Sequence, residues 1–303
     1  MAAGSREPCG VLLLDKPAGY SSTQALARAK RMLAAPKAGH TGTLDPFATG
    51  LLPLAFGEAT KFSRFLIDAP KAYEATLVLG EETATGDIEG EVIARAEPVA
   101  DVARIDSVLA SFIGVQEQRP PMHSAVRVNG RRLYDYARAG EEVERPLRRI
   151  EITSLRRVSL DAALLKIAVR CSKGTYVRTL AMDIGRALGC GAHLRALRRN
   201  ATGPFTVDDA VSLGRLEQEG VEAARRHLLP METMVVGLPR ADLPEATGRR
   251  FRHGQAVPHG AADAGSEWAL FDDTGIFLGI GRADRAGELA PERVVSFGPG
   301  EIP

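Results

Sequence analysis

The residues best suited to chemistry lie in a short glycine-rich stretch, Gly39 to Gly50, which contains three glycines, one histidine and one Asp-Pro pair. Glycine lets a backbone bend and approach a ligand closely. Pro46 disfavours a helical backbone before it, so we expect Asp45 to present a single carboxylate from a loop. The same residues also suit a plain turn that Asp45 merely caps. The density of special residues, together with motifs farther along the chain, favours the catalytic interpretation.

Three further side chains are candidates to assist Asp45. Arg178 lies in the first turn of an expected helix, where a positive charge opposes the helix dipole by a few tenths to ~1 kcal/mol, so it is better placed facing a phosphate or a carboxylate such as Asp45. Tyr73 is either a core tyrosine or the wall of a pocket that stacks on a base. His40 is a candidate general base, phosphate contact or wedge beside an extruded nucleotide, or a loop residue without a role. Exposure to solvent is the ordinary alternative for Arg178.

The elements that would hold these side chains alternate between strands and helices. Apolar residues in alternate positions predict strands over 72–79 and 164–171. Apolar residues spaced by three and four predict a helix from Val177 to Leu188. Other expected elements include strands at 11–14 and 150–158, a helix capped at 21, 22 or 23 that runs to about residue 33, and a short helix at 105–112. A hairpin is expected with its turn at Asn129–Gly130.

Composition indicates an ordinary globular protein of one large and one small domain. The chain has 303 residues, of which 45% are hydrophobic and 25% charged, with a net charge of +1. Proline punctuation over 238–244 suggests a boundary, and short strands with glycine turns beyond it suggest a small β-barrel. No apolar run has the roughly 20 residues of a membrane span, and no signal segment is apparent, so we expect a cytoplasmic protein.

Cysteine and arginine usage narrow the function classes. The three cysteines are scattered, which disfavours a disulfide framework and a zinc site, and no motif has metal-ligand or nucleotide-binding spacing. Arginine predominates in three basic clusters, at 119–149, 186–199 and 249–253. Arginine pairs with phosphate and stacks on bases, which weakly favours RNA over a merely solvated surface.

Several motifs, in order, resemble those of one known family. The most specific are Gly39-His-Thr-Gly-Thr-Leu-Asp-Pro-Phe-Ala-Thr-Gly-Leu-Leu-Pro53 and Cys171-Ser-Lys-Gly-Thr-Tyr-Val-Arg-Thr179. The others are Leu14-Asp-Lys-Pro-Ala-Gly-Tyr-Ser-Ser22 and the segments 57–62, 71–73, 119–125, 130–137 and 192–199. Together these motifs resemble the bacterial tRNA pseudouridine-55 synthases, the TruB family. The resemblance covers residues 10 to about 210, and the region from about 240 resembles a PUA-type domain more loosely.

The resemblance implies an α+β fold: a bent, mixed and mostly antiparallel sheet flanked by helices, with a small C-terminal PUA-like β-barrel. It implies a catalytic domain over 1–238, with an RNA-gripping insertion at about 119–149, and a PUA-like RNA-binding domain over 239–303. The implied activity is isomerisation of uridine to pseudouridine at position 55 in the TΨC arm of tRNA. The implied partner is that stem-loop, with no guide RNA. Because the isomerisation adds and removes nothing, we expect no cofactor, and the residue spacing predicts no metal site and no membrane span. No coiled-coil pattern is apparent, so we expect a monomer.

The same resemblance implies a role for each site residue. Asp45 falls on the catalytic aspartate, and Arg178 falls on the arginine that pairs with it. Tyr73 falls on the tyrosine that stacks on the target base and is placed to move its proton. The remaining pocket positions are His40, Tyr176 and Leu197. Whether Asp45 attacks C1′, adds to C6 or removes the 2′ proton stays open at this stage.

Three rival functions remain from the sequence. A guide-RNA-dependent pseudouridine synthase resembles the catalytic core but lacks the insertion, which 119–149 fills here. A non-catalytic RNA chaperone on the same fold is disfavoured by intact Asp45, Tyr73 and Arg178. An aspartate-dependent hydrolase would need a second carboxylate or a metal cluster, which the motifs do not provide.

Overall fold

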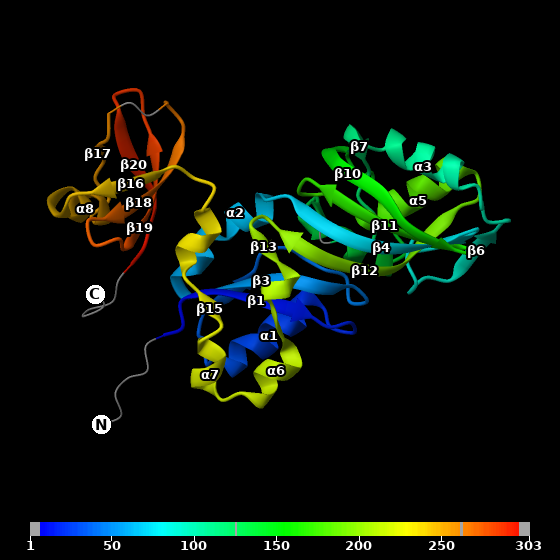
Figure 1. Cartoon of the computed structure of the whole chain (residues 1–303), viewed down its shortest axis with the longest axis horizontal. Coiled ribbons are helices and arrows are strands. Elements are labelled where there is room, and N and C mark those ends of the chain that lie inside the picture. Colours follow the sequence, from blue (N-terminus) through cyan, green and yellow to red (C-terminus); the bar gives the residue numbers. More distant parts are fainter. Residues whose placement is uncertain (1–6, 125, 261–262, 297–303) are drawn as a thin grey trace.

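A large mixed sheet forms the frame of the protein. The computed structural model describes residues 7–296 except 125, 261 and 262. Within this part of the chain an 11-stranded sheet has the main order β14-β1-β3-β12-β4-β11-β10-β7 (Figure 1). Its strands are β1 (Gly10–Lys16), β2 (Ala38–His40), β3 (Thr49–Phe56), β4 (Lys71–Leu79), β7 (Gly114–Gln118), β10 (Arg148–Asp161), β11 (Leu164–Cys171), β12 (Ala192–Thr202), β13 (Phe205–Thr206), β14 (Val211–Ser212) and β15 (Leu228–Leu229).

Most neighbouring strands of this sheet run antiparallel, whereas β1 with β14 and β3 with β12 run parallel. The helices that cover it are α1 (Ser22–Met32), α2 (Ser63–Asp68), α3 (Val102–Ser111), α5 (Val177–Leu188), α6 (Leu213–Gln218) and α7 (Val221–Arg225), with short 3-10 turns η1 (Gly57–Phe62), η2 (Val207–Asp209) and η3 (Met231–Val235). Helix α5 packs on β12 and α3, and its buried side chains join the main hydrophobic core. The expected α+β fold is confirmed.

Local sequence signals explain several of these elements. Ser21 accepts the Gln24 N–H, and the Gln24 side chain accepts the Ser21 N–H, so a capping box starts α1. Helix α5 has the bounds that its apolar spacing predicts, and it ends at Gly189, whose φ of 76° is left-handed. No helix in the described part of the chain is long and apolar enough to cross a membrane.

The C-terminal unit is a separate sheet at one end of the molecule (Figure 1). Its strands are β16 (Arg240–Leu243), β17 (Val257–Pro258), β18 (Glu267–Asp272), β19 (Phe277–Ala283) and β20 (Glu288–Val294), in the order β16-β18-β19-β20-β17, and α8 (Glu245–Arg252) packs on it. Phe62 contacts Phe277 with ring centroids 5.1 Å apart. Arg64 pairs with Glu267 at 2.6 Å, so apolar and charged contacts both fix this unit to η1 and α2.

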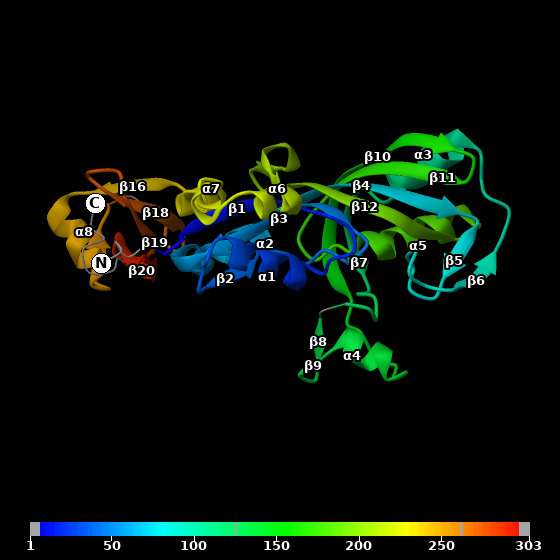
Figure 2. The ribbon, with the colours of Figure 1, turned by 90° about the horizontal axis from the view of Figure 1, so that it is seen from below.

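A small substructure projects from the large sheet between β7 and β10 (Figure 2). It contains β8 (Arg127–Val128), β9 (Arg131–Arg132) and α4 (Leu133–Arg138). Asn129 and Gly130 have φ angles of 51° and 80°, which confirms the predicted hairpin turn. A second small hairpin, β5 (Glu81–Thr83) with β6 (Val92–Arg95), lies at the far end of the molecule from the C-terminal unit.

Candidate active site

The loop between β2 and β3 presents Asp45, as the Asp-Pro pair predicts. Two anchors hold the neighbouring backbone. The Ser22 hydroxyl oxygen accepts the Leu44 N–H at 2.8 Å and donates to the Leu44 carbonyl at 3.1 Å. The Lys16 ammonium donates to the Pro46 carbonyl at 3.3 Å, and burial lowers the pKa of Lys16 to about 8. Asp45 is therefore held from both sides, while about a third of its side chain (32%) stays exposed.

Arg199 supports the same loop from β12. Its side chain is buried, donating from Nε to the Leu51 carbonyl at 2.7 Å and from Nη2 to the Gly42 carbonyl at 3.2 Å. Strands β3 and β12 approach closely at Gly50, where φ is 101° and a Cβ atom would lie 2.3 Å from the Arg199 carbonyl oxygen. Glycine at position 50 thus lets β12 and its arginine reach the loop.

Arg178 faces Asp45 across the site. Its Nη2 lies 2.5 Å from Asp45 Oδ2, and its Nε lies 3.1 Å from Asp87 Oδ2. Nη2 also donates to the His123 carbonyl at 3.3 Å. Because Arg178 and Asp87 are only 5% and 2% exposed, the guanidinium is a buried cation between two carboxylates. A positive charge in the first turn of a helix is better placed beside an anion. For Arg178 in α5, Asp45 and Asp87 of the same chain supply that anion.

Asp87 was not identified from the sequence. It lies in the turn between β5 and β6, where its Oδ1 accepts the Thr85 hydroxyl at 2.5 Å and the Glu89 N–H at 3.1 Å. These bonds fix the carboxylate, so its second oxygen points to Arg178 in one orientation. The sequence signal around Asp87 is only that of a turn, and nothing in it indicates a partner in α5.

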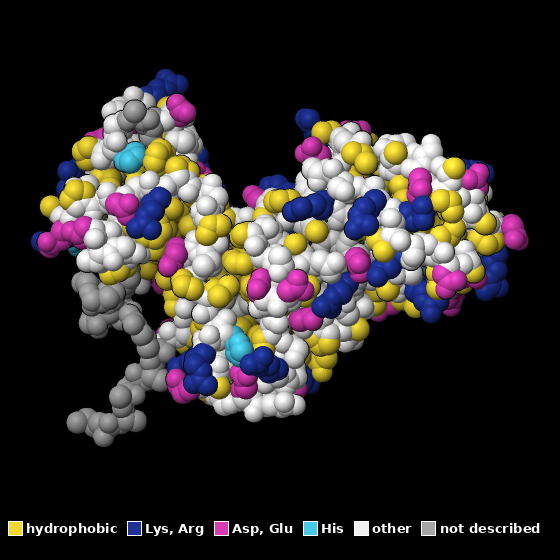
Figure 3. All heavy atoms as spheres, viewed as in Figure 1, with side chains coloured by type: hydrophobic (Ala, Val, Ile, Leu, Met, Phe, Trp, Pro, Cys, Tyr) yellow, Lys and Arg dark blue, Asp and Glu magenta, His cyan; other side chains and the backbone are white. Residues whose placement is uncertain are grey.

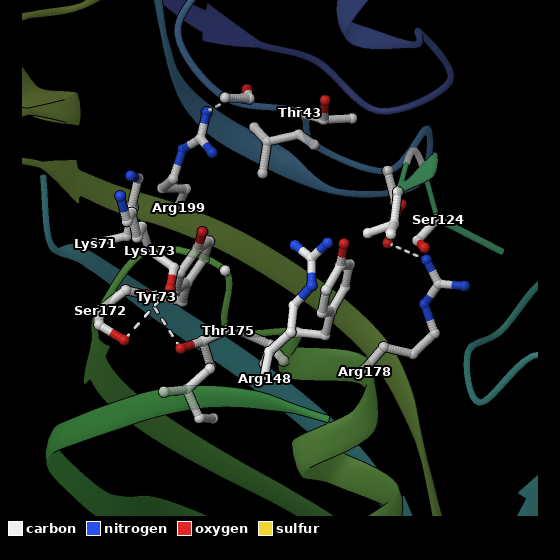
Figure 4. A pocket seen from close by; sticks show the side chains of 18 of the residues that line it. Thr43, Lys71, Tyr73, Ser124, Arg148, Ser172, Lys173, Thr175, Arg178 and Arg199 are labelled. Carbon is white, nitrogen blue, oxygen red and sulfur yellow. Dashed lines mark hydrogen bonds and ion pairs between the residues drawn. The ribbon is translucent and has the colours of Figure 1, made fainter. Parts of the chain in front are cut away.

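Five of the six predicted site residues meet at one cavity of about 720 Å³ (Figure 4). They are Asp45, Tyr73, Tyr176, Arg178 and Leu197. Basic side chains line the same cavity, namely Lys71, Arg148, Arg149, Lys173 and Arg199. A cavity of this size holds a small ligand such as a nucleoside. The basic lining suits a substrate that carries phosphates.

His40 is the exception among the predicted residues. It is half-buried in β2, pairs in register with Leu54 and is not among the side chains that line the cavity. Burial, with a smaller effect from the Arg199 charge, lowers the pKa of His40, which favours the neutral ring. Its role beside an extruded nucleotide stays a prediction.

Tyr73 stands in the middle of the sheet with its ring in the cavity and its hydroxyl toward Arg199 (Figure 4). Strand β4 places it between Val169 of β11 and Arg199 of β12. Burial raises the pKa of Tyr73, and the positive charge of Arg199 opposes that shift. The ring is therefore a protonated phenol at neutral pH, beside a cation able to stabilise its phenolate form.

Comparisons with known proteins show which family this chain belongs to. The family description "TruB family pseudouridylate synthase (N terminal domain)" matches residues 30–177, and "tRNA pseudouridylate synthase B C-terminal domain" matches 178–236. A third, "Pseudouridine synthase II TruB, C-terminal", matches 239–295. The chain is 50% identical to tRNA pseudouridine synthase B of Thiobacillus denitrificans, covering 95% of this chain and 96% of the relative. The chain belongs to the TruB family. It is therefore an enzyme of the tRNA pseudouridine synthase class.

A second relative and two solved structures are also similar to this chain. The tRNA pseudouridine synthase B of Aromatoleum aromaticum is 52% identical over 289 residues, covering 95% of this chain and 92% of the relative. A chain in the crystal structure of a Cbf5-Nop10-Gar1 complex is 28% identical with a TM-score of 0.74, covering 95% of this chain and 85% of that one. A chain in an H/ACA RNP bound to a substrate RNA containing 2′-deoxyuridine is 26% identical with a TM-score of 0.72, covering 95% and 86%. These likenesses support the pseudouridine synthase fold and the PUA-like C-terminal sheet.

Proposed function

We propose that this TruB-family enzyme isomerises the uridine at position 55 in the TΨC arm of tRNA, with Asp45 as the catalytic carboxylate. The observation that carries the proposal is the contact of Asp45 with the buried Arg178 at the edge of a cavity lined by Tyr73 and basic residues. The names of the related tRNA pseudouridine synthases support tRNA as the substrate.

The reaction breaks the bond from C1′ to N1 of the nucleoside and forms one from C1′ to C5. The base must first leave the helical stack, which costs a few kcal/mol and requires a pocket with an aromatic platform. We assign the platform to the Tyr73 ring, with Tyr176 and Leu197 as further walls. The proton that leaves C5 needs an acceptor, and N1 of the detached base needs a proton. We assign both transfers to the Tyr73 hydroxyl, which gives its proton to the base and then, as a phenolate that the Arg199 charge would stabilise, takes the proton from C5.

Arg178 orients the Asp45 carboxylate through their ion pair. The buried guanidinium also offsets the cost of removing that carboxylate from water when the base enters the pocket. Attack on C1′, addition to C6 and removal of the 2′ proton all require an ionised Asp45 that faces the nucleoside. The ion pair with Arg178 therefore serves each of the three routes.

Two parts of the chain are suited to hold the rest of the tRNA. We propose that the insertion (residues 119–149) grips the TΨC arm, because its hairpin and α4 project from the body and carry arginines (Figure 2). We also propose that 239–303 is a PUA-like RNA-binding domain, separated from a catalytic domain over 1–238. A broad hollow lies between the C-terminal unit and the far end of the large sheet, with Lys and Arg side chains beside it (Figure 3).

The insertion also affects which partners the enzyme needs. Because we assign tRNA gripping to the chain's own insertion, we propose that it acts on tRNA without a guide RNA. We also propose that it acts as a monomer in the cytoplasm. Size-exclusion chromatography of the purified protein with and without tRNA tests the monomer. Activity on a tRNA transcript in the absence of any other RNA tests the guide.

Mapping of pseudouridine by chemical sequencing after incubation with an unmodified tRNA transcript tests the function. We expect modification at position 55 with the unaltered enzyme and none with Asp45→Asn, whose tRNA affinity should stay within about threefold because phosphate contacts carry binding. Asp106→Asn is the matched control, since Asp106 is exposed and pairs with Arg157 on the surface. Substantial turnover by Asp45→Asn, or modification at another position, would refute the proposal.

A further inference from the structure

Gln118 is the last residue of the edge strand β7, and its side chain contacts the beginning of the active-site helix α5. Its side chain is 4% exposed. Its Oε1 accepts the Tyr176 N–H at 2.7 Å, and its Nε2 donates to the Tyr176 carbonyl at 3.1 Å. Tyr176 is the residue before α5, and its own side chain makes no capping bond. The Gln118 carboxamide therefore satisfies a backbone N–H at the start of the helix.

Gln118 is also the point at which the chain leaves the sheet for the insertion. It pairs in register with Arg148, where β10 begins after the insertion's hairpin and helix. Five residues beyond Gln118, the His123 carbonyl accepts a hydrogen bond from Arg178. The root of the insertion thus contacts the first turn of α5 twice, at the backbone of Tyr176 and at the guanidinium of Arg178.

The rest of α5 does not depend on these contacts. Leu180, Ile184 and Leu188 are buried in the main hydrophobic core, so the body of the helix is anchored by packing. At the first turn, the two polar contacts add to the packing of Val177 in the core and to the ion pairs of Arg178, and they tie that turn to the insertion. A shift of 1 Å in a catalytic constellation can cost about 100-fold in rate.

We propose that Gln118 is a positioning residue for catalysis, which ties the first turn of α5 to the root of the insertion so that Arg178 meets Asp45. The inference rests on the proposed roles of Arg178 and Asp45. The same polar contacts then hold the root of the insertion in place and align Arg178 with the catalytic carboxylate of Asp45.

The test compares Gln118→Ala and Gln118→Glu with Gln116→Ala in the full chain. Gln116 lies on the same strand, is half-buried and donates to the Phe112 carbonyl at 2.6 Å, so it controls for loss of a β7 glutamine. For each variant we measure the single-turnover rate with enzyme in saturating excess and the dissociation constant for tRNA. We also measure the thermal midpoint and the backbone hydrogen exchange of residues 176–179.

For Gln118→Ala we expect a rate about 10- to 100-fold lower, an affinity within about threefold and faster exchange at the start of α5. Gln118→Glu keeps the acceptor but, when ionised, cannot donate to the Tyr176 carbonyl. Its rate deficit relative to the unaltered enzyme should therefore narrow as the pH falls. Gln116→Ala should behave as the unaltered enzyme.

An unchanged rate in folded Gln118→Ala would overturn the inference, as would equal losses of rate and affinity. If the alanine variant does not fold, Gln118→Glu decides, and a rate equal to that of the unaltered enzyme at every pH would overturn it. Failure of both variants to fold would assign Gln118 to the fold instead. Absence of pseudouridine with the unaltered enzyme, or turnover by Asp45→Asn, would refute the proposed function rather than this inference.

Discussion

Replacing Asp87 by asparagine removes a buried charge beside Arg178 while keeping the shape of the side chain. The amide oxygen can still accept from Thr85 and Glu89, so the turn between β5 and β6 should persist. At the 3.1 Å that separates Asp87 Oδ2 from Arg178 Nε, the lost attraction is about 5 kcal/mol for an effective dielectric constant of about 20. The loss is partly offset because one fewer carboxylate is desolvated and Arg178 keeps Asp45. We therefore expect the free energy of unfolding to fall by about 1–3 kcal/mol.

The larger consequence of Asp87→Asn should be catalytic. With one charged partner instead of two, the guanidinium of Arg178 is less firmly directed, so Asp45 is held in its productive orientation for less of the time. We expect a single-turnover rate about 10- to 100-fold lower. Affinity for tRNA should stay within about threefold, since Asp87 does not line the cavity and phosphate contacts carry binding.

The assay follows pseudouridine formation in a tRNA transcript under saturating enzyme, alongside filter binding and urea denaturation. Asp106→Asn again serves as the control for loss of one carboxylate from an ion pair. A rate equal to that of the unaltered enzyme, with stability reduced, would show that Asp87 serves only the fold. A loss of affinity that matches the loss of rate would show that Arg178 acts in binding and refute the reasoning.

Three further predictions follow from the site. Arg178→Ala should nearly abolish turnover because it leaves Asp45 without its cation, and an unchanged rate and pH profile would contradict the pairing. Tyr73→Phe should bind tRNA well but fail in turnover, since stacking is worth roughly 1–3 kcal/mol per base and only the hydroxyl is lost; Tyr73→Leu should also fail. An active Phe variant with an inactive Leu variant would make Tyr73 only a platform, and near-normal turnover by Tyr73→Leu would exclude both roles. The pKa of Lys16 is about 8 in the folded state and 10.5 in the unfolded state. Between these pH values the unfolded chain binds more protons, so Lys16 makes the free energy of unfolding rise with pH, by up to about 3 kcal/mol. Lys16→Met should lack this part of the rise when urea midpoints are measured from pH 7.5 to 10.5, and identical pH profiles would show that Lys16 does not titrate there.

The sequence alone was sufficient for features that depend on neighbouring residues. The helix from Val177 to Leu188 and the hairpin turn at Asn129–Gly130 follow from local periodicity and backbone preference, and both occur with the predicted residues. The Asp-Pro pair at Asp45 and the charge of Arg178 in a first helical turn were likewise local signals. Motif order then identified the family, because these local patterns occur together in it.

Tertiary structure decided which of these residues meet. Asp87 and Gln118 act on the start of α5 from distant turns and strand ends, and neither carries a local signal of that contact. His40 belongs to the predicted motif, but it pairs with Leu54 rather than lining the cavity. Periodicity tells which face of an element is buried, whereas partners across the site depend on strand order and register. Those are set by packing of the whole sheet, so the second carboxylate on Arg178 became visible only in three dimensions.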